Sequence, residues 1–354
     1  MNAREKALTR LDELIEAGFC APQDAPQLAE VLNRYSVAVP AEVAALIAGA
    51  GAPMARQFIP DAAELRRLPQ ELADPIGDGA HEAAPGLIHR YPDRVLLKLT
   101  SVCPVYCRFC FRRESVGAGT SGLLSEAALD EAFAYVAARP EIWELIVTGG
   151  DPLAVSPRRL AALSQRLRQI DHVKILRFHS RVPALTPSRV TDELIAAMKE
   201  SGKTIYVALH ANHPAELTPA ARAACAKLVE AGIAMVSQTV LLRGVNDNVE
   251  TLAALMRGLV EARVKPYYLH QGDLAPGTSH LRVPLAEGQN LVRALLGRLS
   301  GLCQPTYVVD IPGGHGKAPV GPAYGRQEME NGWRIEDWQG NSHLYRDEPT
   351  GSFE

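Results

Sequence analysis

From Arg94 onward the chain alternates short apolar runs with amphipathic helical patterns, and this alternation restricts its fold more than any other feature. The runs are rich in β-branched and other apolar residues, as the fully buried strands of parallel sheets are. They span Val95–Leu99, Trp143–Val147, Val173–Phe178, Thr204–Leu209, Ala234–Val240 and Pro266–His270. Repeated strand–helix units form a parallel sheet with right-handed crossovers. We therefore predict an α/β fold with a partial (β/α) barrel of about six such units, with a doubly wound sheet as the alternative.

The helices between these runs have clear sequence signals at their ends. Ser156-Pro157 and Thr218-Pro219 each place a capping hydroxyl before a proline, which favours a helix start. Gly202 and Gly232 stand where a left-handed residue is expected to end a helix. These signals support the predicted alternation of strands and helices.

The 354 residues divide into three predicted parts. Residues 1–85 form a helical N-terminal segment and a connection, and the proline spacing predicts irregular structure from about 53 to 93. Residues 86–304 form the partial-barrel domain, and residues 305–354 form a C-terminal segment. Met1 to Ala17 carry charges in a helical pattern and lack the apolar core of a signal peptide.

The composition argues against several classes of protein. A formal net charge of -3 gives no reason to expect nucleic-acid or membrane binding. No run approaches the ~18 apolar residues of a membrane span. Cys20, Cys225 and Cys303 stand singly in the sequence, and we predict that they are buried free thiols. This pattern suits a reducing compartment, so we expect a cytoplasmic protein.

Cys103, Cys107 and Cys110 place three thiols within eight residues, directly after the first apolar run. Three thiolates at C-x3-C-x2-C spacing can hold three irons of a cubane iron–sulfur cluster. No fourth cysteine is near in sequence, so one iron would stay open, as in reactive metal centres. A structural zinc site wants four ligands, which makes zinc, or thiols without a metal, the less favoured interpretation.

Two glycine-rich loops follow other strands. Gly149-Gly150-Asp151 lets the backbone approach a ligand, and Asp151 could accept a hydrogen bond from an ammonium, although alone this is an ordinary turn. The loop from Pro312 to Lys317 lacks the spacing and the Ser or Thr of a phosphate-binding P-loop. A lysine held by rigid backbone can form an imine with pyridoxal phosphate (PLP), and a flexible surface turn is the alternative. Motifs at the ends of several strands are typical of barrel enzymes.

These motifs occur, with others, in an order that resembles one family. The further motifs are Arg112-Arg113 and the run from Gln238 to Asp247. From about Pro85 to about Pro349 the chain resembles lysine 2,3-aminomutase, a family of radical S-adenosylmethionine (SAM) enzymes that also use PLP. The resemblance implies a radical-SAM partial barrel with a helical N-terminal extension and a C-terminal PLP-binding loop segment. It also implies a [4Fe-4S] cluster, SAM and PLP as cofactors.

The resemblance assigns residues to the metal cluster and to PLP. The cysteines of the triplet match those that hold the cluster, whose open iron binds SAM. Lys317 matches the catalytic lysine that binds PLP as an imine. The residues that match the PLP phosphate site are Arg90, Tyr91 and Arg94.

The resemblance also assigns residues to SAM and to the substrate. The residues that match positions near SAM are Gly149, Gly150, Asp151, Ser180, Arg181 and Gln238. Arg112 matches the residue that pairs with the substrate α-carboxylate. Asp273 and Asp310 match the two aspartates that hold the distal ammonium of lysine. Relatives that act on glutamate carry non-acidic residues at these two positions.

Two features depart from the family pattern. Asn248 stands where longer members have a cysteine, and their three further C-terminal cysteines have no counterpart here. We therefore expect no zinc and leave the family's mode of subunit assembly open. His315 stands where a glycine is common, and it either alters the surroundings of the lysine or faces solvent. His210 and His213 are left without a role.

The resemblance implies an isomerase that converts L-lysine to β-lysine by moving an amino group from C2 to C3. Two alternatives keep this chemistry: an enzyme that makes β-lysine for attachment to elongation factor P, and one that acts on another amino acid. The first shares the sequence from Cys110 to Arg113 but lacks the complete loop from Asp310 to Lys317. An electron-transfer protein is the non-enzymatic alternative. We expect lysine as substrate, a flavodoxin or ferredoxin as electron donor, and a homo-oligomer.

Overall fold

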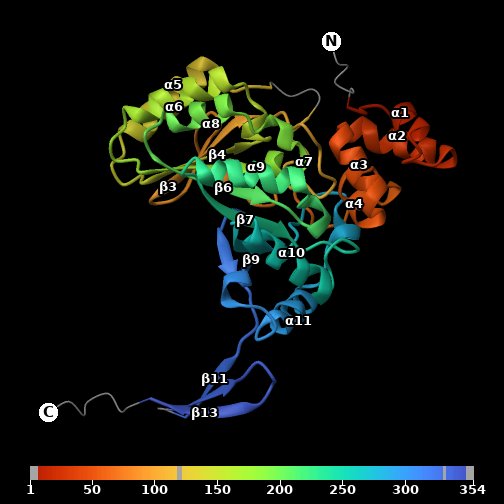
Figure 1. Cartoon of the computed structure of the whole chain (residues 1–354), viewed down its shortest axis with the longest axis vertical. Coiled ribbons are helices and arrows are strands. Elements are labelled where there is room, and N and C mark those ends of the chain that lie inside the picture. Colours follow the sequence, from red (N-terminus) through yellow and green to blue (C-terminus); the bar gives the residue numbers. More distant parts are fainter. Residues whose placement is uncertain (1–6, 118–121, 330–331, 348–354) are drawn as a thin grey trace.

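The computed structural model describes residues 7–117, 122–329 and 332–347. Its main sheet takes strands β1 to β10 in chain order (Figure 1). The parallel strands are β3 (Arg94–Thr100), β4 (Glu144–Gly149), β5 (Ile175–Ser180), β6 (Thr204–His210), β7 (Ala234–Val240), β8 (Lys265–His270) and β9 (Thr306–Asp310). The antiparallel strands at the two ends are β1 (Glu82–Ala84), β2 (Leu87–Tyr91) and β10 (Lys317–Pro319).

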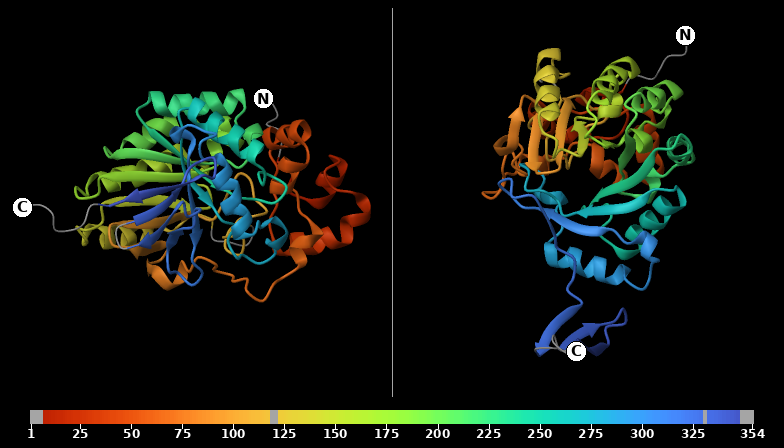
Figure 2. Two further views of the ribbon diagram at one scale, coloured as in Figure 1. Left: turned by 90° about the horizontal axis from the view of Figure 1, so that it is seen from below. Right: turned by 90° about the vertical axis from the view of Figure 1, so that its left-hand side faces the viewer.

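The predicted alternation of strands and helices is confirmed. Every predicted strand is present, and the ends differ from the prediction by at most two residues. The parallel order includes one further strand, β9, next to β8. The sheet is curved and open, and helices cover its outer side (Figure 2). The fold is thus α/β with a partial barrel rather than a flat doubly wound sheet.

The helices that follow the parallel strands begin and end close to their predicted signals. These helices are α5 (Glu126–Ala137), α6 (Pro157–Arg168), α7 (Val182–Leu185), α8 (Asp192–Lys199), α9 (Pro219–Glu230), α10 (Val249–Glu261) and α11 (Leu285–Leu295). Thr218 Oγ1 accepts a hydrogen bond from the Ala221 amide (3.1 Å), whereas the Ser156 side chain makes no capping bond. Gly202 and Gly232 have φ angles of 63° and 85°, as predicted for residues that end helices.

Short 3₁₀ turns connect many of these elements. Their bounds are η1 (Pro22–Asp24), η2 (Ala62–Leu65), η3 (Gly79–His81), η4 (Pro152–Ala154), η5 (Pro187–Arg189), η6 (Pro214–Glu216), η7 (Ser279–Leu281) and η8 (Gly301–Cys303). Several of them, such as η4 and η6, lie directly after parallel strands. They therefore shape the loops at the edge of the sheet where functional groups gather.

The N-terminal helices lie together beside the barrel (Figure 1). They are α1 (Leu11–Glu16), α2 (Ala25–Arg34), α3 (Ala41–Ala50) and α4 (Ala52–Phe58). Their buried side chains, including Leu14 and Phe58, belong to the same apolar cluster as Leu97 of the barrel. The prediction of irregular structure over 53–93 is wrong in part, because α4 and the β1–β2 hairpin lie within it. The hairpin forms because the edge of β3 is free to pair with β2.

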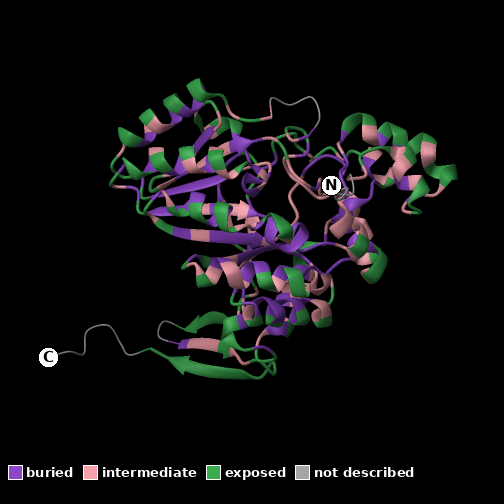
Figure 3. Cartoon of the chain, turned by 45° about the horizontal axis from the view of Figure 1, so that its top comes forward, coloured by how far each residue is buried: buried purple, intermediate pink, exposed green. Residues whose placement is uncertain are grey.

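A second sheet projects from the body at the C-terminal end. It contains β11 (Gly325–Met329), β12 (Gly332–Glu336) and β13 (Ser342–Arg346), and most of its residues are exposed (Figures 1 and 3). An ion pair between Arg293 and Glu336 (2.6 Å) links it to α11. Trp338, between β12 and β13, also packs against Gly297 near the end of α11.

Two further expectations concern the thiols and membrane crossing. Cys20, Cys225 and Cys303 are buried free thiols, as predicted. Within the described residues, none of the helices has both the length and the apolar character that crossing a bilayer requires.

Candidate active site

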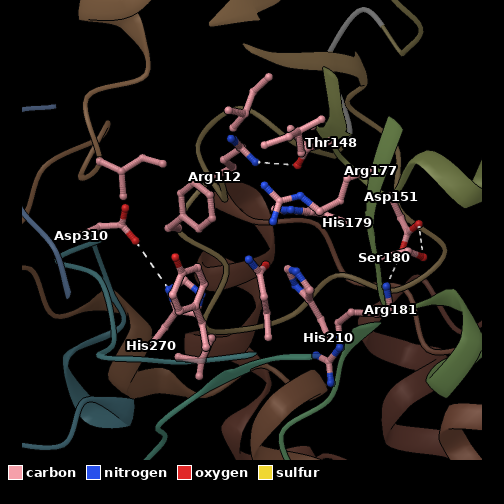
Figure 4. Close-up of a pocket in the computed structure, with 18 of the residues that line it drawn as sticks. Arg112, Thr148, Asp151, Arg177, His179, Ser180, Arg181, His210, His270 and Asp310 are labelled. Carbon is pink, nitrogen blue, oxygen red and sulfur yellow. Dashed lines mark hydrogen bonds and ion pairs between the residues drawn. The ribbon is translucent and has the colours of Figure 1, made fainter. Parts of the chain in front are cut away.

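A cavity of about 690 Å³ lies on the inner side of the partial barrel. Side chains from the parallel strands and from the two antiparallel ends line it (Figure 4). Every residue predicted for a site lines this one cavity: Arg90, Tyr91, Arg94, Cys103, Cys107, Cys110, Arg112, Gly149, Gly150, Asp151, Ser180, Arg181, Gln238, Asp273, Asp310 and Lys317. These residues span more than 220 positions in sequence, from Arg90 to Lys317, so the fold and not local sequence brings them together.

The cysteine triplet lies in the loop that follows β3. Cys103, Cys107 and Cys110 are free thiols that face the cavity. Burial raises the pKa of each thiol, that of Cys110 to about 11, and the neighbouring Cys107 sulfur adds to the effect at Cys110. Among the described residues no group of three His, Cys, Asp or Glu side chains is drawn together around a single ion. A cubane does not need one, because each thiolate binds its own iron.

Gly149 and Gly150 are required by the close approach of two chain segments. The Gly150 amide donates to the Thr100 carbonyl (2.5 Å), and the Asp151 amide donates to the Val102 carbonyl (3.0 Å). A Cβ atom at either glycine would collide with one of these carbonyl groups, and Gly149 also has a φ of 113°. The glycine loop is therefore packed against the residues that lead into Cys103, which fixes the start of the cysteine loop.

Asp151 connects the end of β4 to the end of β5. Its carboxylate accepts hydrogen bonds from the Leu153 amide (3.0 Å), Ser180 Oγ (2.7 Å) and the Arg181 amide (2.8 Å) (Figure 4). Burial raises the pKa of Asp151 although these bonds oppose the shift. Since the carboxylate has about four acceptor positions, little capacity is left for a ligand ammonium. Asp151 thus positions Ser180 and Arg181, a role that the sequence did not indicate.

The predicted phosphate-binding residues lie at the junction of β2 and β3. Arg90 donates to the Ile76 carbonyl (2.7 Å) and lies 3.3 Å from Asp78, while its buried Nε has no partner. The Arg94 guanidinium lies 3.9 Å from the centre of the Tyr91 ring. Guanidinium groups with a free donor suit phosphate oxygens. The residues present therefore fit a phosphate group.

Lys317 begins β10, and its loop brings the two ends of the open sheet together. The Lys317 amide donates to Tyr91 Oη (2.8 Å), and His81 Nε2 lies 2.8 Å from the Gly314 carbonyl. Gly316 has a φ of 85°, and a Cβ there would lie 2.7 Å from Tyr91 Oη. His315 is exposed, so it faces solvent. The loop is a docked structure and not a flexible surface turn.

Two aspartates face the cavity beside Lys317. The Lys317 ammonium donates to both carboxylate oxygens of Asp310, at 2.6 and 2.7 Å. Although burial opposes ionisation, a hydrogen bond from His270 and the charge of Lys317 lower the pKa of Asp310. Burial and the negative charge of Asp310 raise the pKa of Asp273 to about 7. The pair therefore offers one fixed negative charge and one that titrates near neutrality.

Arg112 reaches the cavity from the cysteine loop, and a carboxylate that the sequence did not single out holds it. Asp78 accepts from Arg112 Nε (3.0 Å) and Nη2 (2.8 Å), and Arg112 Nη1 donates to Thr148 Oγ1 (3.2 Å). Asp78 also pairs with Arg90, so one buried carboxylate joins the predicted phosphate and carboxylate-binding arginines. No motif marks Asp78, because its role depends on residues distant in sequence.

Three half-buried histidines form a further group to which the sequence analysis assigned no role. His179, His210 and His270 line the cavity, and the Nε2 atom of each lacks a hydrogen-bond partner (Figure 4). Burial lowers their pKa values, that of His210 to about 3, so all are neutral at pH 7. Their positions in β5, β6 and β8 could have suggested the cavity. His213 instead accepts from the Ala215 amide (3.2 Å) and caps η6.

Asn248, which stands at a cysteine position of the family pattern, has a local structural role. Its side chain accepts a hydrogen bond from the Thr251 amide (2.8 Å) and caps α10. Asparagine is among the preferred residues at the start of a helix.

Comparisons with known proteins show which family the chain resembles over most of its length. The family model of the Radical SAM superfamily matches residues 97–256. An L-lysine 2,3-aminomutase from Fusobacterium nucleatum is 43% identical over 272 residues, which cover 77% of this chain and 64% of that protein. One from Acetoanaerobium sticklandii is 40% identical over 297 residues, which cover 84% of this chain and 71% of that protein. The chain thus spans about two thirds of the length of these curated relatives.

Similar proteins include one with a different substrate in its name. A glutamate 2,3-aminomutase from Clostridioides difficile is 35% identical over 281 residues, which cover 79% of this chain and 66% of that protein. Among solved structures, a radical SAM methyltransferase from Sphaerobacter thermophilus aligns with a TM-score of 0.42 and 20% identity, covering 63% of this chain and 68% of that chain.

Proposed function

Since the chain belongs to the lysine 2,3-aminomutase family of radical SAM enzymes, we propose that it converts L-lysine to β-lysine. In this reaction the amino group moves from C2 to C3 of the same molecule. One observation carries the proposal. A single cavity joins the cysteine triplet, the lysine loop and charged groups that suit both ends of a lysine molecule.

The donor groups of this cavity suit the cofactors of the family. Cys103, Cys107 and Cys110 would hold a [4Fe-4S] cluster, leaving one iron for SAM. Arg90 would meet the PLP phosphate with its unpaired Nε, and Lys317 would carry PLP covalently. When bound, these cofactors supply the electron, the hydrogen-abstracting radical and the delocalising ring that the rearrangement needs.

The remaining residues are assigned to SAM binding because they lie near the thiols. Ser180 and Gln238 line the same cavity as the thiols, and Gly149 and Gly150 border the cysteine loop. Asp151 would act by holding Ser180 and the Arg181 backbone in place, because its carboxylate is already occupied within the protein. The chain would thus position SAM through a rigid edge of the barrel rather than through a mobile loop.

The substrate would be selected by charge at both of its ends. Arg112 would pair with the α-carboxylate, and Asp78 and Thr148 orient its guanidinium. Asp273 and Asp310 would pair with the distal ammonium. The Lys317 ammonium already lies on Asp310, which supports a site that accepts an alkylammonium group. A second carboxylate on the substrate, as in glutamate, would meet like charge there.

Two partners complete the proposal. The cluster would need a one-electron donor of low potential, of the flavodoxin or ferredoxin class. The protein would also assemble as a homo-oligomer, and the projecting sheet β11–β13 exposes apolar side chains such as Met329 and Tyr345 that suit a contact. Mass measurement in solution would test the assembly.

An anaerobic assay tests the proposed function. The protein is reconstituted with iron and sulfide, loaded with PLP, and incubated with SAM, dithionite and L-lysine. We expect β-lysine by mass spectrometry and nuclear magnetic resonance, and none from a Cys107→Ala protein, which should lose the cluster. If glutamate is isomerised as fast as lysine, lysine is not the specific substrate. A protein that is fully loaded with cluster and PLP and forms no β-lysine would overturn the activity.

A further inference from the structure

Arg181 contacts one of the cysteine sulfurs directly. Its Nη1 lies 2.9 Å from Cys107 Sγ and donates a hydrogen bond to it. Among the described residues, the hydrogen bonds include no other from a cationic side chain to a sulfur of the triplet. The family resemblance placed Arg181 near SAM, and it gave no reason to expect a contact with a cysteine.

A rigid network aims the Arg181 guanidinium at this sulfur. Arg181 Nη2 donates to Glu216 Oε2 (2.6 Å) and to Gln57 Oε1 (3.1 Å). Glu216 is fully buried and also accepts from the amides of Asn212 (2.9 Å) and His213 (3.0 Å) and from Gln57 Nε2 (3.2 Å). With all its partners fixed, Glu216 cannot turn away without leaving several donors unpaired.

The same network also grips the cysteine loop itself. The Gln57 carbonyl accepts from the amide of Arg108, the residue after Cys107 (2.8 Å). The Arg181 guanidinium lies 5.1 Å from the centre of the Phe58 ring and 5.3 Å from that of the Phe109 ring. The Arg181 side chain is only 10% exposed, so its charge acts on Cys107 through a medium less polar than bulk water. The contact between the cation and the sulfur is therefore built into the fold.

We propose that Arg181 sets the reduction potential of the cluster by stabilising the extra negative charge of its reduced form through Cys107. This inference rests on the proposed function, because it requires that Cys107 binds iron. Reduction adds one electron to the cluster, supplied by a one-electron donor, and the site gains one negative charge. Hydrogen bonds and positive charge at cluster sulfurs favour the reduced state. Arg181 is thus a positioning residue that raises the potential.

The test is a redox titration of the cluster without SAM or substrate. Dithionite supplies the electrons, and electron paramagnetic resonance measures the reduced fraction. In Arg181→Gln we expect the ratio of reduced to oxidised cluster at a fixed potential to fall about tenfold, a shift of about 59 mV to lower potential for a one-electron couple. The potential of Arg181→Lys should lie between those of Arg181→Gln and the unmodified protein, because lysine keeps the positive charge but lacks the planar set of guanidinium donors.

Arg177→Lys is the matched control. Arg177 lines the same cavity and pairs with Glu144 (3.0 Å), and among the described residues its hydrogen-bond and ion-pair partners include no sulfur. Its replacement should leave the potential unchanged. If Arg181→Gln fails to hold a cluster, the potential of Arg181→Lys still decides the question, since an unshifted value there contradicts the proposal.

Two results would overturn the inference in different ways. An unchanged potential in Arg181→Gln, together with weaker SAM binding by calorimetry, would mean that Arg181 acts only on SAM. A Cys107→Ala protein that keeps full iron content and the complete resonance signal would show that Cys107 is not a cluster ligand. The second result would also count against the proposed function, whereas the first would leave that function intact.

Discussion

Asp273 and Asp310 are neighbours in one cavity, yet their carboxylates are held in different states. Despite burial, His270 and Lys317 lower the pKa of Asp310 and keep it an anion. Burial and the charge of Asp310 raise the pKa of Asp273 to about 7. Repulsion between the two carboxylates in the free site keeps Asp273 partly protonated near neutral pH, and its ionisation adds a second negative charge that attracts a cation. We therefore expect the charge states of these two carboxylates to determine both which substrate binds and how its binding depends on pH.

Removing the charge of Asp273 tests the substrate site. We expect Asp273→Asn to lower kcat/KM for lysine by two to three orders of magnitude, since losing one partner of a buried charge pair costs about 3–5 kcal/mol. Asp310→Asn should act in the same direction, but it also frees Lys317, so Asp273→Asn is the cleaner variant. Cluster and PLP content should remain unchanged in Asp273→Asn.

The control for these variants is Asp192→Asn. Asp192 pairs with Lys227 at the surface, where its side chain is 88% exposed, and its replacement should not change turnover. Near-normal lysine turnover in both Asp273→Asn and Asp310→Asn would exclude free lysine as the substrate.

The raised pKa of Asp273 predicts how lysine binding depends on pH. Below its pKa of about 7 the carboxyl is protonated and cannot pair with an ammonium. The groups that face it are Asp310 and Asp78, which raise this pKa, and Lys317 and Arg112, which lower it. We therefore expect KM for lysine to fall as pH rises from 6 to 8. A similar profile in Asp273→Asn would show that another group causes the dependence.

At the scale of elements, the strands follow from the sequence and the loops do so only in part. Parallel strands such as β7 are rich in apolar and β-branched residues, although Ser237 and Gln238 interrupt the apolar run, and the predicted and observed bounds coincide there. The β1–β2 hairpin was not predicted, although its pairing is local: Ala84 faces Leu87 in β2, and Tyr91 of β2 faces Arg94 of β3. The prolines in the two short turns favoured an irregular connection in the sequence, whereas here they join paired strands.

The candidate site, too, was predicted from the sequence only in part. The spacing of the cysteines and glycines singled out the loop from Cys103 to Cys110 and the loop from Pro312 to Lys317, and residues of both line the cavity. The roles of their residues came from the family resemblance. Asp78, Gln57 and Glu216 carry no motif, and only the fold brings them to Arg112 and Arg181. Supporting residues of this kind need the three-dimensional structure.

The loop before Lys317 provides a prediction for a single element. Borohydride treatment of the PLP-loaded protein should fix the cofactor to Lys317, as shown by peptide mass mapping. We expect much less of this product in Gly316→Ala, because a Cβ would press on Tyr91 Oη and the left-handed backbone costs about 1–2 kcal/mol in any residue but glycine.

Gly321→Ala is the matched control for the loop. No atom lies within 4 Å of a Cβ built at Gly321, and its backbone is not left-handed, so PLP loading should stay normal. A product mapped to Lys98 or Lys265 instead of Lys317 would contradict the assignment of the PLP lysine.

At the scale of the whole molecule, the N-terminal helices and the barrel are joined through a buried charge. Glu64 is fully buried and pairs with Arg108 at 2.5 Å and with Arg113, both from the cysteine loop. The Arg113 guanidinium also stacks 3.6 Å from the centre of the Tyr35 ring, which follows α2. The N-terminal segment therefore supports the loop that would hold the cluster.

Glu64→Gln tests this connection. It leaves two buried arginines without their carboxylate, which costs about 3–5 kcal/mol and should lower Tm by roughly 10 °C in calorimetry. Glu126→Gln is the control, because Glu126 also pairs with two arginines but is 63% exposed, so its Tm should barely change. Equal Tm values for the two variants would mean that the buried cluster does not hold the segments together.

We propose that this protein moves the amino group of lysine within one molecule. Lysine labelled with ¹⁵N only at its α-amino group tests it most directly, with the anaerobic, fully loaded enzyme and unlabelled ammonium in the medium. We predict that nuclear magnetic resonance will find the ¹⁵N on C3 of β-lysine, with no loss of label to the medium. Label that remains on C2, or that exchanges with the unlabelled ammonium, would contradict the account.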